Sequence, residues 1–253
     1  MTEFTIITCT YNAASVLCRT LDSVRLQTGV RVEHIIIDGA SSDGTMDIVE
    51  DYARKAGGHE VKFTSEPDRG LYDAMNKGLQ RATGDYLLFL NAGDTLPAPD
   101  TLLTVASAVD GTRRPAVIYG DTDIVDLDGR FLRHRRLAPP EHLSWRSFRR
   151  GMLVCHQAFY VRRDIAQSEL YNLSYRYSAD VDWCIRVMRR AAAEHLSLTY
   201  VHAVVAHYLD GGMSVANHRA SLKERFHVMC THYGVLSTVV MHLWFAGRSF
   251  IKR

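Results

Sequence analysis

SEPDRGLYDAMNKGLQRATGDYLLFLNAGD, residues 65–94, is the stretch that decides the fold. Pro67 prevents the opening loop from continuing the strand before it, and apolar residues then recur at the spacing of one helical face. Tyr86–Leu90 is an unbroken apolar run, short enough to be a strand covered on both faces. The polar turn Asn91–Asp94 follows directly. Because ligands in open α/β sheets bind at the carboxyl ends of strands, this turn is a candidate site for a metal ion and a phosphate group.

The chain before this stretch alternates between strand and helix patterns. Helical patterns separate three predicted strands, at Phe4–Cys9, Val32–Ile37 and Val61–Thr64. Such long connections favour parallel strands with right-handed crossovers. The loops Thr10–Asn12 and Asp38–Ser42 then meet the Asn91–Asp94 turn at one edge of the sheet. Each polar residue alone fits an ordinary turn, but three polar strand ends at one edge indicate a ligand site.

Length, charge and cysteine content restrict the class of protein. A chain of 253 residues fits one α/β domain with a small appendage. Its net charge of +2 gives no global electrostatic case for nucleic acid. The five cysteines have no CxxC spacing, which argues against a disulfide framework or zinc site and favours a cytoplasmic location. We recognise no signal peptide at the start, and no apolar run approaches the roughly 20 residues of a membrane span.

The pattern is less regular after residue 94. Further strands are predicted at Ala116–Tyr119, Cys155–Val161 and Thr199–His207, with a hairpin around Asp128–Gly129. Ser178–Asp182 enters a helix and brings two carboxylates into its first turn. Capping and dipole chemistry account for one of them but not obviously for both. Arginines concentrated between residues 133 and 150 fit either a solvated surface or contact with an anionic acceptor or lipid headgroups.

Taken together, the motifs resemble family 2 glycosyltransferases with the GT-A fold, in the bacterial branch for colanic acid, capsule and O-antigen assembly. The matching segments span residues 5–214 in the expected order: TIITCTYNAA, IIIDGASSDGT, SEPDRGLYDAMNKG, GDYLLFLNAGD, CHQAFYVRR, SADVDW and HYLDGGMS. The SEPDRGLYDAMNKG block in register with the others is highly specific. The resemblance implies an α/β fold with a Rossmann-like, mostly parallel sheet flanked by helices, a small antiparallel part and a C-terminal helical tail.

The resemblance also implies a nucleotide-sugar donor linked to UDP or GDP, and a divalent cation, Mg²⁺ or Mn²⁺. Asp94 and His207 are the candidate metal ligands, although His207 also fits an ordinary core histidine. Asn91 and Gly93 stand where the family more often has acids, so phosphate oxygens and water would complete the coordination. The candidate donor-binding residues are Thr10, Tyr11, Asn12, Asp38, Asp68, Arg69, Asn91, Gly93, Gly211, Gly212 and Ser214.

The implied reaction is an inverting transfer, in which a general base takes the proton of the acceptor hydroxyl. The resemblance places this base at Asp180, with Ala179 where the family usually has Glu. Asp182 is the second catalytic candidate and otherwise caps the helix or orients the acceptor. His156 and Gln157 are expected on the acceptor side.

The expected function is transfer of a sugar to a saccharide or lipid-linked acceptor during cell-surface polysaccharide assembly. The alternative is a nucleotide-sugar-binding or nucleotidyltransferase-like protein without sugar transfer. A nucleotidyltransferase would need a glycine-rich, lysine-bearing loop after the first strand, and residues 10–15 contain neither glycine nor lysine.

We expect a catalytic domain at residues 1–214 and a helical extension at residues 215–253. The extension is strongly apolar from Val235 and ends with basic residues. It packs on the core or on a second copy in a homodimer, or lies on a membrane. In the membrane alternative Trp244 and Phe245 lie at headgroup depth, and three basic residues face anionic lipid: Arg248, Lys252 and Arg253. We favour peripheral contact with the inner face of the plasma membrane, because acceptors of such enzymes are often lipid-linked.

Overall fold

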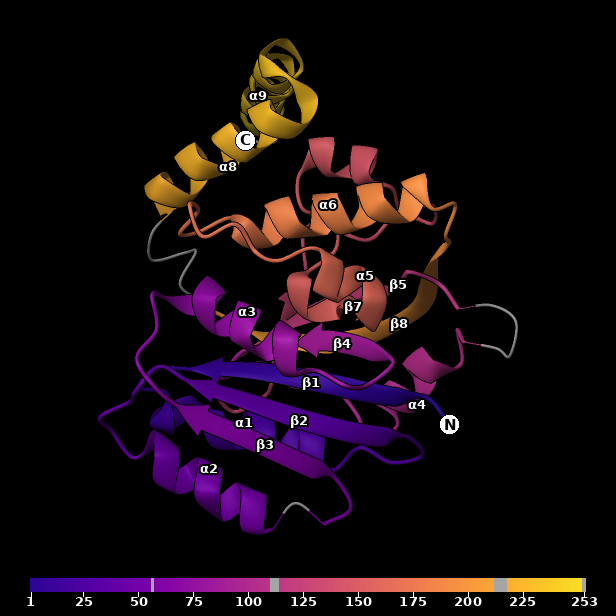
Figure 1. Ribbon diagram of the computed structural model, residues 1–253. Helices are drawn as coiled ribbons and strands as arrows, with labels where there is room; N and C mark the ends of the chain where they lie inside the picture. The colour runs from indigo at the N-terminus through magenta and orange to yellow at the C-terminus, as the bar shows by residue number, and fades with distance from the viewer. Residues whose placement is uncertain (56, 110–113, 212–217, 252–253) are drawn as a thin grey trace.

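The computed structural model describes residues 1–55, 57–109, 114–211 and 218–251. One eight-stranded sheet crosses the molecule in the order β3-β2-β1-β4-β7-β5-β6, and β8 pairs with β5 (Figure 1). The strands are β1 Glu3–Thr10, β2 Arg31–Asp38, β3 Glu60–Ser65, β4 Tyr86–Phe89, β5 Val117–Val125, β6 Phe131–His134, β7 Phe159–Arg162 and β8 Leu198–Leu209.

The pairing confirms a mostly parallel sheet. β1 lies between β2 and β4, β3 joins β2, and all of these pairs are parallel, as is the pair of β5 with β8. β7 is antiparallel to β4 and β5, and β6 is antiparallel to β5. Thr10 at the end of β1 pairs with Asp38 at the end of β2, and the N–H of Leu90 after β4 donates to Ile7 O. The predicted polar loops therefore meet at one edge.

Helices cover both faces of the sheet. The chain contributes α1 Ala14–Arg25, α2 Thr45–Arg54, α3 Leu71–Arg81, α4 Thr101–Ala106, α5 Arg163–Ser168, α6 Ala179–Ala193, α8 His218–Tyr233 and α9 Val235–Ile251, with 3-10 turns η1 Trp145–Arg150 and η2 His156–Ala158. On one face, apolar residues of α1 and α2 pack on β2. On the other face α6 lies between the sheet and the α8–α9 pair (Figure 1).

Two close contacts fix the positions of α3 and α6 on the sheet. A Cβ atom at Gly78 would lie only 2.5 Å from Ile7 Cγ2, so the glycine lets α3 approach β1. The fully buried ring of Trp183 on α6 packs edge-on against Phe89 of β4, with ring centroids 5.7 Å apart. The amino ends of α3 and α6 are thereby held near the carboxyl ends of the parallel strands.

One predicted strand is only partly correct. The sequence predicts a strand over Cys155–Val161, but His156–Ala158 form a 3-10 turn and β7 begins at Phe159. A strand would send His156 and Gln157 to opposite faces. In the turn, both side chains instead reach buried partners, Tyr171 and Asp94 respectively. Those contacts join residues that are distant in sequence, so the local sequence pattern does not predict the turn.

Candidate active site

Asp38 anchors the loops that follow β1 and β2. Its fully buried carboxylate accepts hydrogen bonds from Thr10 Oγ1 at 2.9 Å, Ser65 Oγ at 2.7 Å, and the Ser41 N–H and Oγ at 2.8 and 2.5 Å. Burial alone would raise the pKa of Asp38, but these hydrogen bonds outweigh it and lower the pKa. The structure therefore places Asp38 and Thr10 behind the loop surface, where they hold its shape.

Tyr11 and Asp68 lie at the surface of the same loops. Tyr11 is 69% exposed as a residue. A Cβ atom at Gly39 would lie 2.7 Å from Asp68 Oδ2 and 3.4 Å from Tyr11 Cδ2, so these two side chains flank the glycine. Arg69 is also exposed and pairs with Asp73 at 3.0 Å. An open aromatic ring beside a carboxylate suits a planar base with N–H donors.

The other residues predicted to bind the sugar donor lie in different loops, and some lie outside the described residues. Asn12 has a positive φ of 49° and accepts the Ser42 N–H through its side chain at 2.9 Å, which closes the loop after β1. Gly211 follows β8 with a φ of 92°, in the region that favours glycine. Gly212 and Ser214 lie outside the described residues.

Asp94 is buried at the centre of the polar edge. Only 4% of the residue is exposed, and each carboxylate oxygen accepts a hydrogen bond: Oδ1 from the Leu209 N–H at 2.9 Å and Oδ2 from Gln157 Nε2 at 2.8 Å. Burial raises the pKa of Asp94 to about 7, although the hydrogen bonds oppose the shift. This carboxylate joins the turn after β4 to β8 and to η2.

Gly93 explains one departure from the family pattern. Its φ is 97°, and a Cβ atom there would lie 2.8 Å from Leu209 Cδ2. Its N–H donates to Thr20 Oγ1 at 2.8 Å, and that hydroxyl donates to Asp94 O at 2.8 Å. An acidic side chain at 93 would therefore meet both backbone strain and a steric conflict.

The residues around this turn fit a cation that takes most of its ligands from a diphosphate. Asn91 Oδ1 is buried and has no hydrogen-bond partner among the described residues, and an amide oxygen suits a hard cation. Burial lowers the pKa of half-buried His207, which favours the neutral imidazole that metals bind. Each Asp94 oxygen accepts one protein hydrogen bond, which leaves a second lone pair on each for a cation. Within the described residues no group of three or more His, Cys, Asp and Glu side chains is placed to hold a metal.

Asp180 lies in the first turn of α6 and is half-buried. Its Oδ1 accepts the Val181 N–H at 2.9 Å and the Tyr72 hydroxyl at 3.3 Å. Among the described residues Oδ2 has no hydrogen-bond partner. Tyr72 is a site residue that our sequence analysis missed, although it lies inside the SEPDRGLYDAMNKG block. Asp180 is thus held through Oδ1, and within the described part of the chain no hydrogen bond to Oδ2 would compete with an acceptor hydroxyl.

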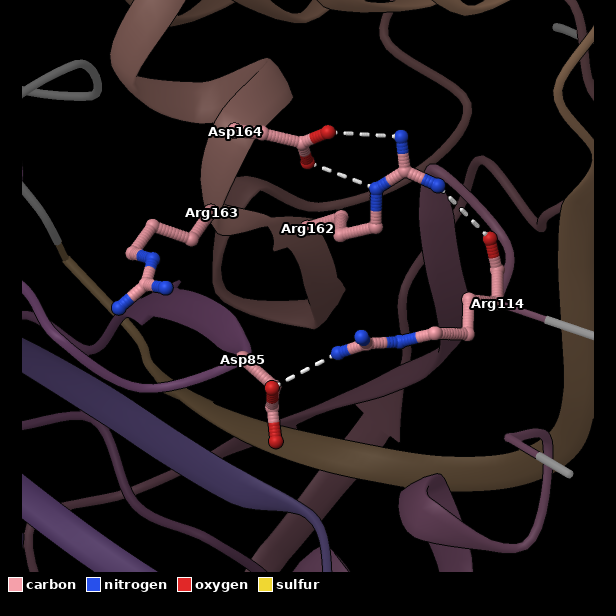
Figure 2. A pocket seen from close by; sticks show the side chains of 5 residues that line it. All are labelled: Asp85, Arg114, Arg162, Arg163 and Asp164. Atoms are coloured by element: carbon pink, nitrogen blue, oxygen red, sulfur yellow. Dashed lines mark hydrogen bonds and ion pairs between the residues drawn. The ribbon is translucent and has the colours of Figure 1, made fainter. Parts of the chain in front are cut away.

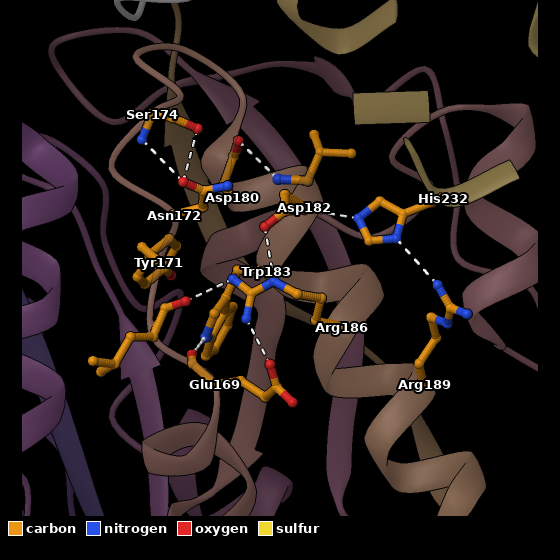
Figure 3. Close-up of polar contacts among 12 residues, drawn as sticks. Glu169, Tyr171, Asn172, Ser174, Asp180, Asp182, Trp183, Arg186, Arg189 and His232 are labelled. Atoms are coloured by element: carbon orange, nitrogen blue, oxygen red, sulfur yellow. Dashed lines mark hydrogen bonds and ion pairs between the residues drawn. The ribbon is translucent and has the colours of Figure 1, made fainter. Parts of the chain in front are cut away.

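Asp182 lies in the same turn but faces α8 (Figure 3). It is 4% exposed, and its oxygens accept from Arg186 Nε at 2.8 Å and His232 Nε2 at 2.7 Å. Arg186 also pairs with Glu169 at 2.6 Å. Burial alone would raise the pKa of Asp182, but the His232 and Arg186 contacts lower it. These contacts favour a role in docking α8 on α6, and they favour Asp180 over Asp182 as a base.

His156 and Gln157 are both buried rather than open to an acceptor. His156 contacts Tyr171 Oη at 2.5 Å and stacks on Phe89, and burial lowers its pKa to about 4. Tyr171 in turn stacks on Tyr72, the partner of Asp180. Since Gln157 donates to Asp94, a continuous series of contacts links the Asp180 region to the Asp94 turn.

A charged hollow lies at the opposite edge of the sheet (Figure 2). Its volume is about 280 Å³ and it is lined by Asp85, Arg114, Arg162, Arg163 and Asp164. Asp85 immediately precedes β4, so this hollow is at the amino end of that strand. Arg114 pairs with Asp85 and Arg162 with Asp164, each at 2.7 Å. This hollow is separate from the candidate active site described above.

The chain belongs to glycosyl transferase family 2, whose sequence profile matches residues 5–197. It is thus a glycosyltransferase, and its sheet and flanking helices have the GT-A fold. The family predicted from the motifs is confirmed.

Individual relatives and solved structures agree with this assignment. A PGL/p-HBAD biosynthesis glycosyltransferase of Mycobacterium bovis is 38% identical over 213 residues, which cover 83% of this chain and 78% of that protein. The crystal structure of S. aureus TarS 1–349 in complex with UDP-GlcNAc has a TM-score of 0.70 at 17% identity, covering 90% of this chain and 64% of that one. The mannosyltransferase PcManGT from Pyrobaculum calidifontis, in complex with GDP-Man and Mn²⁺, has a TM-score of 0.63 at 18% identity, covering 96% and 75%.

The contacts of Asp182 predict a loss of stability when its charge is removed. Asp182→Asn should lower the free energy of unfolding by about 1–3 kcal/mol, because Arg186 and His232 lose a buried anionic partner. Urea denaturation measures this. Asp22→Asn, which removes an exposed pair with Arg25, is the control and should change stability by less than about 0.5 kcal/mol. Equal effects for both variants would contradict a docking role for Asp182.

The raised pKa of Asp94 predicts a pH dependence with a definite sign. Between pH 5 and 7 the folded protein retains a proton that the unfolded chain has lost, so rising pH destabilises the fold. Relative to Asp94→Asn, the wild-type free energy of unfolding should fall by about 2–3 kcal/mol from pH 5 to pH 8. Urea denaturation at both pH values, with a chelator present, measures the difference. Parallel pH profiles would be inconsistent with a buried, titrating Asp94.

Proposed function

We propose that the protein transfers a sugar with inversion from a UDP- or GDP-linked donor, with a divalent cation, to a saccharide or lipid-linked acceptor in cell-surface polysaccharide or glycolipid assembly. The observation that carries the proposal is the Asp180 carboxylate, whose Oδ1 is held by Tyr72 and Val181 and whose Oδ2 has no hydrogen-bond partner among the described residues. The relative named as a PGL/p-HBAD biosynthesis glycosyltransferase and the solved structures in complex with UDP-GlcNAc and GDP-Man support the substrate class.

On the donor side, we propose that the base stacks on Tyr11 and donates an N–H to Asp68, while Arg69 lies beside it. Asp38 and Thr10 act from behind the loop by keeping it in shape. The diphosphate lies over the turn after β4, near His207. When bound there by Asn91, His207 and Asp94, a divalent cation would neutralise the charge of the departing diphosphate.

On the acceptor side, we propose that Asp180 Oδ2 accepts the proton of the attacking hydroxyl. The hydroxyl oxygen forms the new bond to the anomeric carbon as the bond from that carbon to the phosphate oxygen breaks. The electron pair of the broken bond leaves with the nucleoside diphosphate. Tyr72 keeps the carboxylate oriented through Oδ1, so that Oδ2 faces the acceptor.

Asp180→Asn should lower turnover by about 100-fold or more, because an amide cannot take the proton. The dissociation constant of the donor should stay within about twofold, since Asp180 makes no donor contact in this scheme. Transfer assays and calorimetric donor titration measure the two quantities. Asp182→Asn is the matched comparison in the same helical turn, and its turnover per folded molecule should fall far less than that of Asp180→Asn, because it leaves the proposed base in place. Near-normal turnover of Asp180→Asn would remove Asp180 from the base role.

The donor class is testable independently. A thermal-shift screen of nucleoside diphosphates with and without Mg²⁺ or Mn²⁺ identifies the base and the cation, and transfer assays with the matching sugar nucleotides follow. Donor binding without any sugar transfer or donor hydrolysis would favour the alternative of a nucleotide-sugar-binding protein.

We also propose that α9 lies on a membrane surface and that the protein binds its acceptor there. Within the described residues no helix has both the length and the apolar character to cross a bilayer. On one face of α9, however, Leu236, Val240 and Leu243 are 80%, 56% and 67% exposed. Arg149 of η1 donates to Ser237 on this helix at 2.9 Å, which puts exposed basic residues of η1 beside the apolar face. Such a combination suits an anionic lipid surface.

This surface predicts sensitivity to two exposed leucines. The double variant Leu236→Ser/Leu243→Ser should bind vesicles containing phosphatidylglycerol at least about tenfold more weakly, because two apolar side chains no longer enter the lipid. Vesicle sedimentation measures binding. Leu127→Ser changes a 70% exposed leucine on the β5–β6 turn and should have no effect. Equal sedimentation of the double variant and wild type would exclude α9 as the contact. The side chains of Phe245 and Arg248 lie outside the described part, as do Lys252 and Arg253.

A further inference from the structure

The amino end of α6 is capped by a side chain from another helix. Glu224 of α8 accepts hydrogen bonds from the successive backbone N–H groups of Arg176, Tyr177 and Ser178, at 2.7, 2.6 and 2.6 Å. Ser178 is the residue that precedes α6, and its own side chain makes no capping bond. Its hydroxyl instead donates to Ser221 O at 3.3 Å, again on α8.

The role of Glu224 differs from that of an ordinary surface carboxylate. Among the described residues no cationic side chain lies within ion-pair distance of it, so backbone N–H groups are its partners. The amino end of a helix carries partial positive charge and unpaired N–H groups, which a carboxylate stabilises. Glu224 thus holds, from another helix, the three residues that lead into α6, including the N–H of the N-cap residue Ser178.

The position of this cap gives it a functional consequence. Asp180 is only two residues beyond Ser178, and its backbone belongs to the turn that the cap completes. Tyr72 holds one oxygen of Asp180 from α3, but that contact is long, at 3.3 Å. One turn further along α6, the hydrogen bond between His232 and Asp182 also holds α8 against α6. Contacts from α8 therefore add to the packing of Trp183 in fixing the backbone that carries Asp180.

We propose that Glu224 is a positioning residue for Asp180, so that α8 of the C-terminal extension forms part of the active site. This inference rests on the proposed function of Asp180 and extends it. Without the carboxylate the segment 176–181 loosens, and Asp180 Oδ2 spends less time where the acceptor hydroxyl arrives. The donor loops after β1, β2 and β4 are untouched, because Glu224 has no contact with them among its hydrogen bonds.

The test compares Glu224→Gln and Glu224→Asp with Glu194→Gln in the full-length chain. Glu194 is a carboxylate at the opposite end of α6, where it pairs with Arg190. Glu224→Gln should lower the turnover per donor site, counted by calorimetry, by at least about tenfold, with the donor dissociation constant within twofold. Amide hydrogen exchange in residues 178–183 should be at least tenfold faster. Glu224→Asp retains a carboxylate and should recover part of the turnover, whereas Glu194→Gln should match wild type.

A double variant separates positioning from general loss of structure. If Glu224 acts through Asp180, adding Glu224→Gln to Asp180→Asn should leave turnover within about twofold of Asp180→Asn alone. Additive losses would overturn the proposal, as would faster exchange with unchanged turnover or lower turnover with unchanged exchange. If Glu224→Gln does not fold, the same measurements on Glu224→Asp test the proposal. If the wild type transfers no sugar, the proposed function fails, and the exchange measurement still tests whether Glu224 holds the Asp180 segment.

Discussion

The buried carboxylate of Asp94 is the interaction on which the arrangement of the site depends. Its two oxygens accept hydrogen bonds from the Leu209 backbone and the Gln157 amide, so one side chain fastens the end of β4 to the end of β8 and to the turn before β7. A buried charge is tolerated only where such donors surround it. The raised pKa shows that the donors only partly offset the cost of burial. The β1–β4 half of the sheet and the β5–β8 half are thus held together at the edge where we propose the donor site.

The acids identified in the sequence have distinct physical roles. Asp38 and Asp182 are satisfied by protein donors and hold loops or helices together. Asp68 and Asp180 are only partly buried, whereas Asp94 is buried and has a raised pKa. Burial and partners, rather than residue type, distinguish an acid that shapes the site from one that is free to react there.

The regular part of the fold was predictable because it follows from local pattern. Apolar runs identify β1 and β4, the alternation of strand and helix patterns identifies β2 and β3, and the helical spacing after Gly70 identifies α3 to within a residue or two. The turn at His156 was missed because its shape depends on Tyr171 and Asp94, which are distant in sequence. The need for glycine at 93 arises from Leu209 on β8 and was equally hidden. The partners of Asp180 and Asp182 on α3 and α8 could not be read from spacing for the same reason.

The cap on α6 also bears on the order in which the protein is made. Glu224 follows Ser178 by 46 residues, so Asp180 leaves the ribosome well before the carboxylate that supports its helix. The donor loops can form from the first hundred residues, whereas the acid on α6 gains its support only when α8 has been synthesised and has folded back. A nascent chain would thus complete the loops proposed to bind the nucleotide base first, then the His207 region proposed for the diphosphate, and last the support of Asp180.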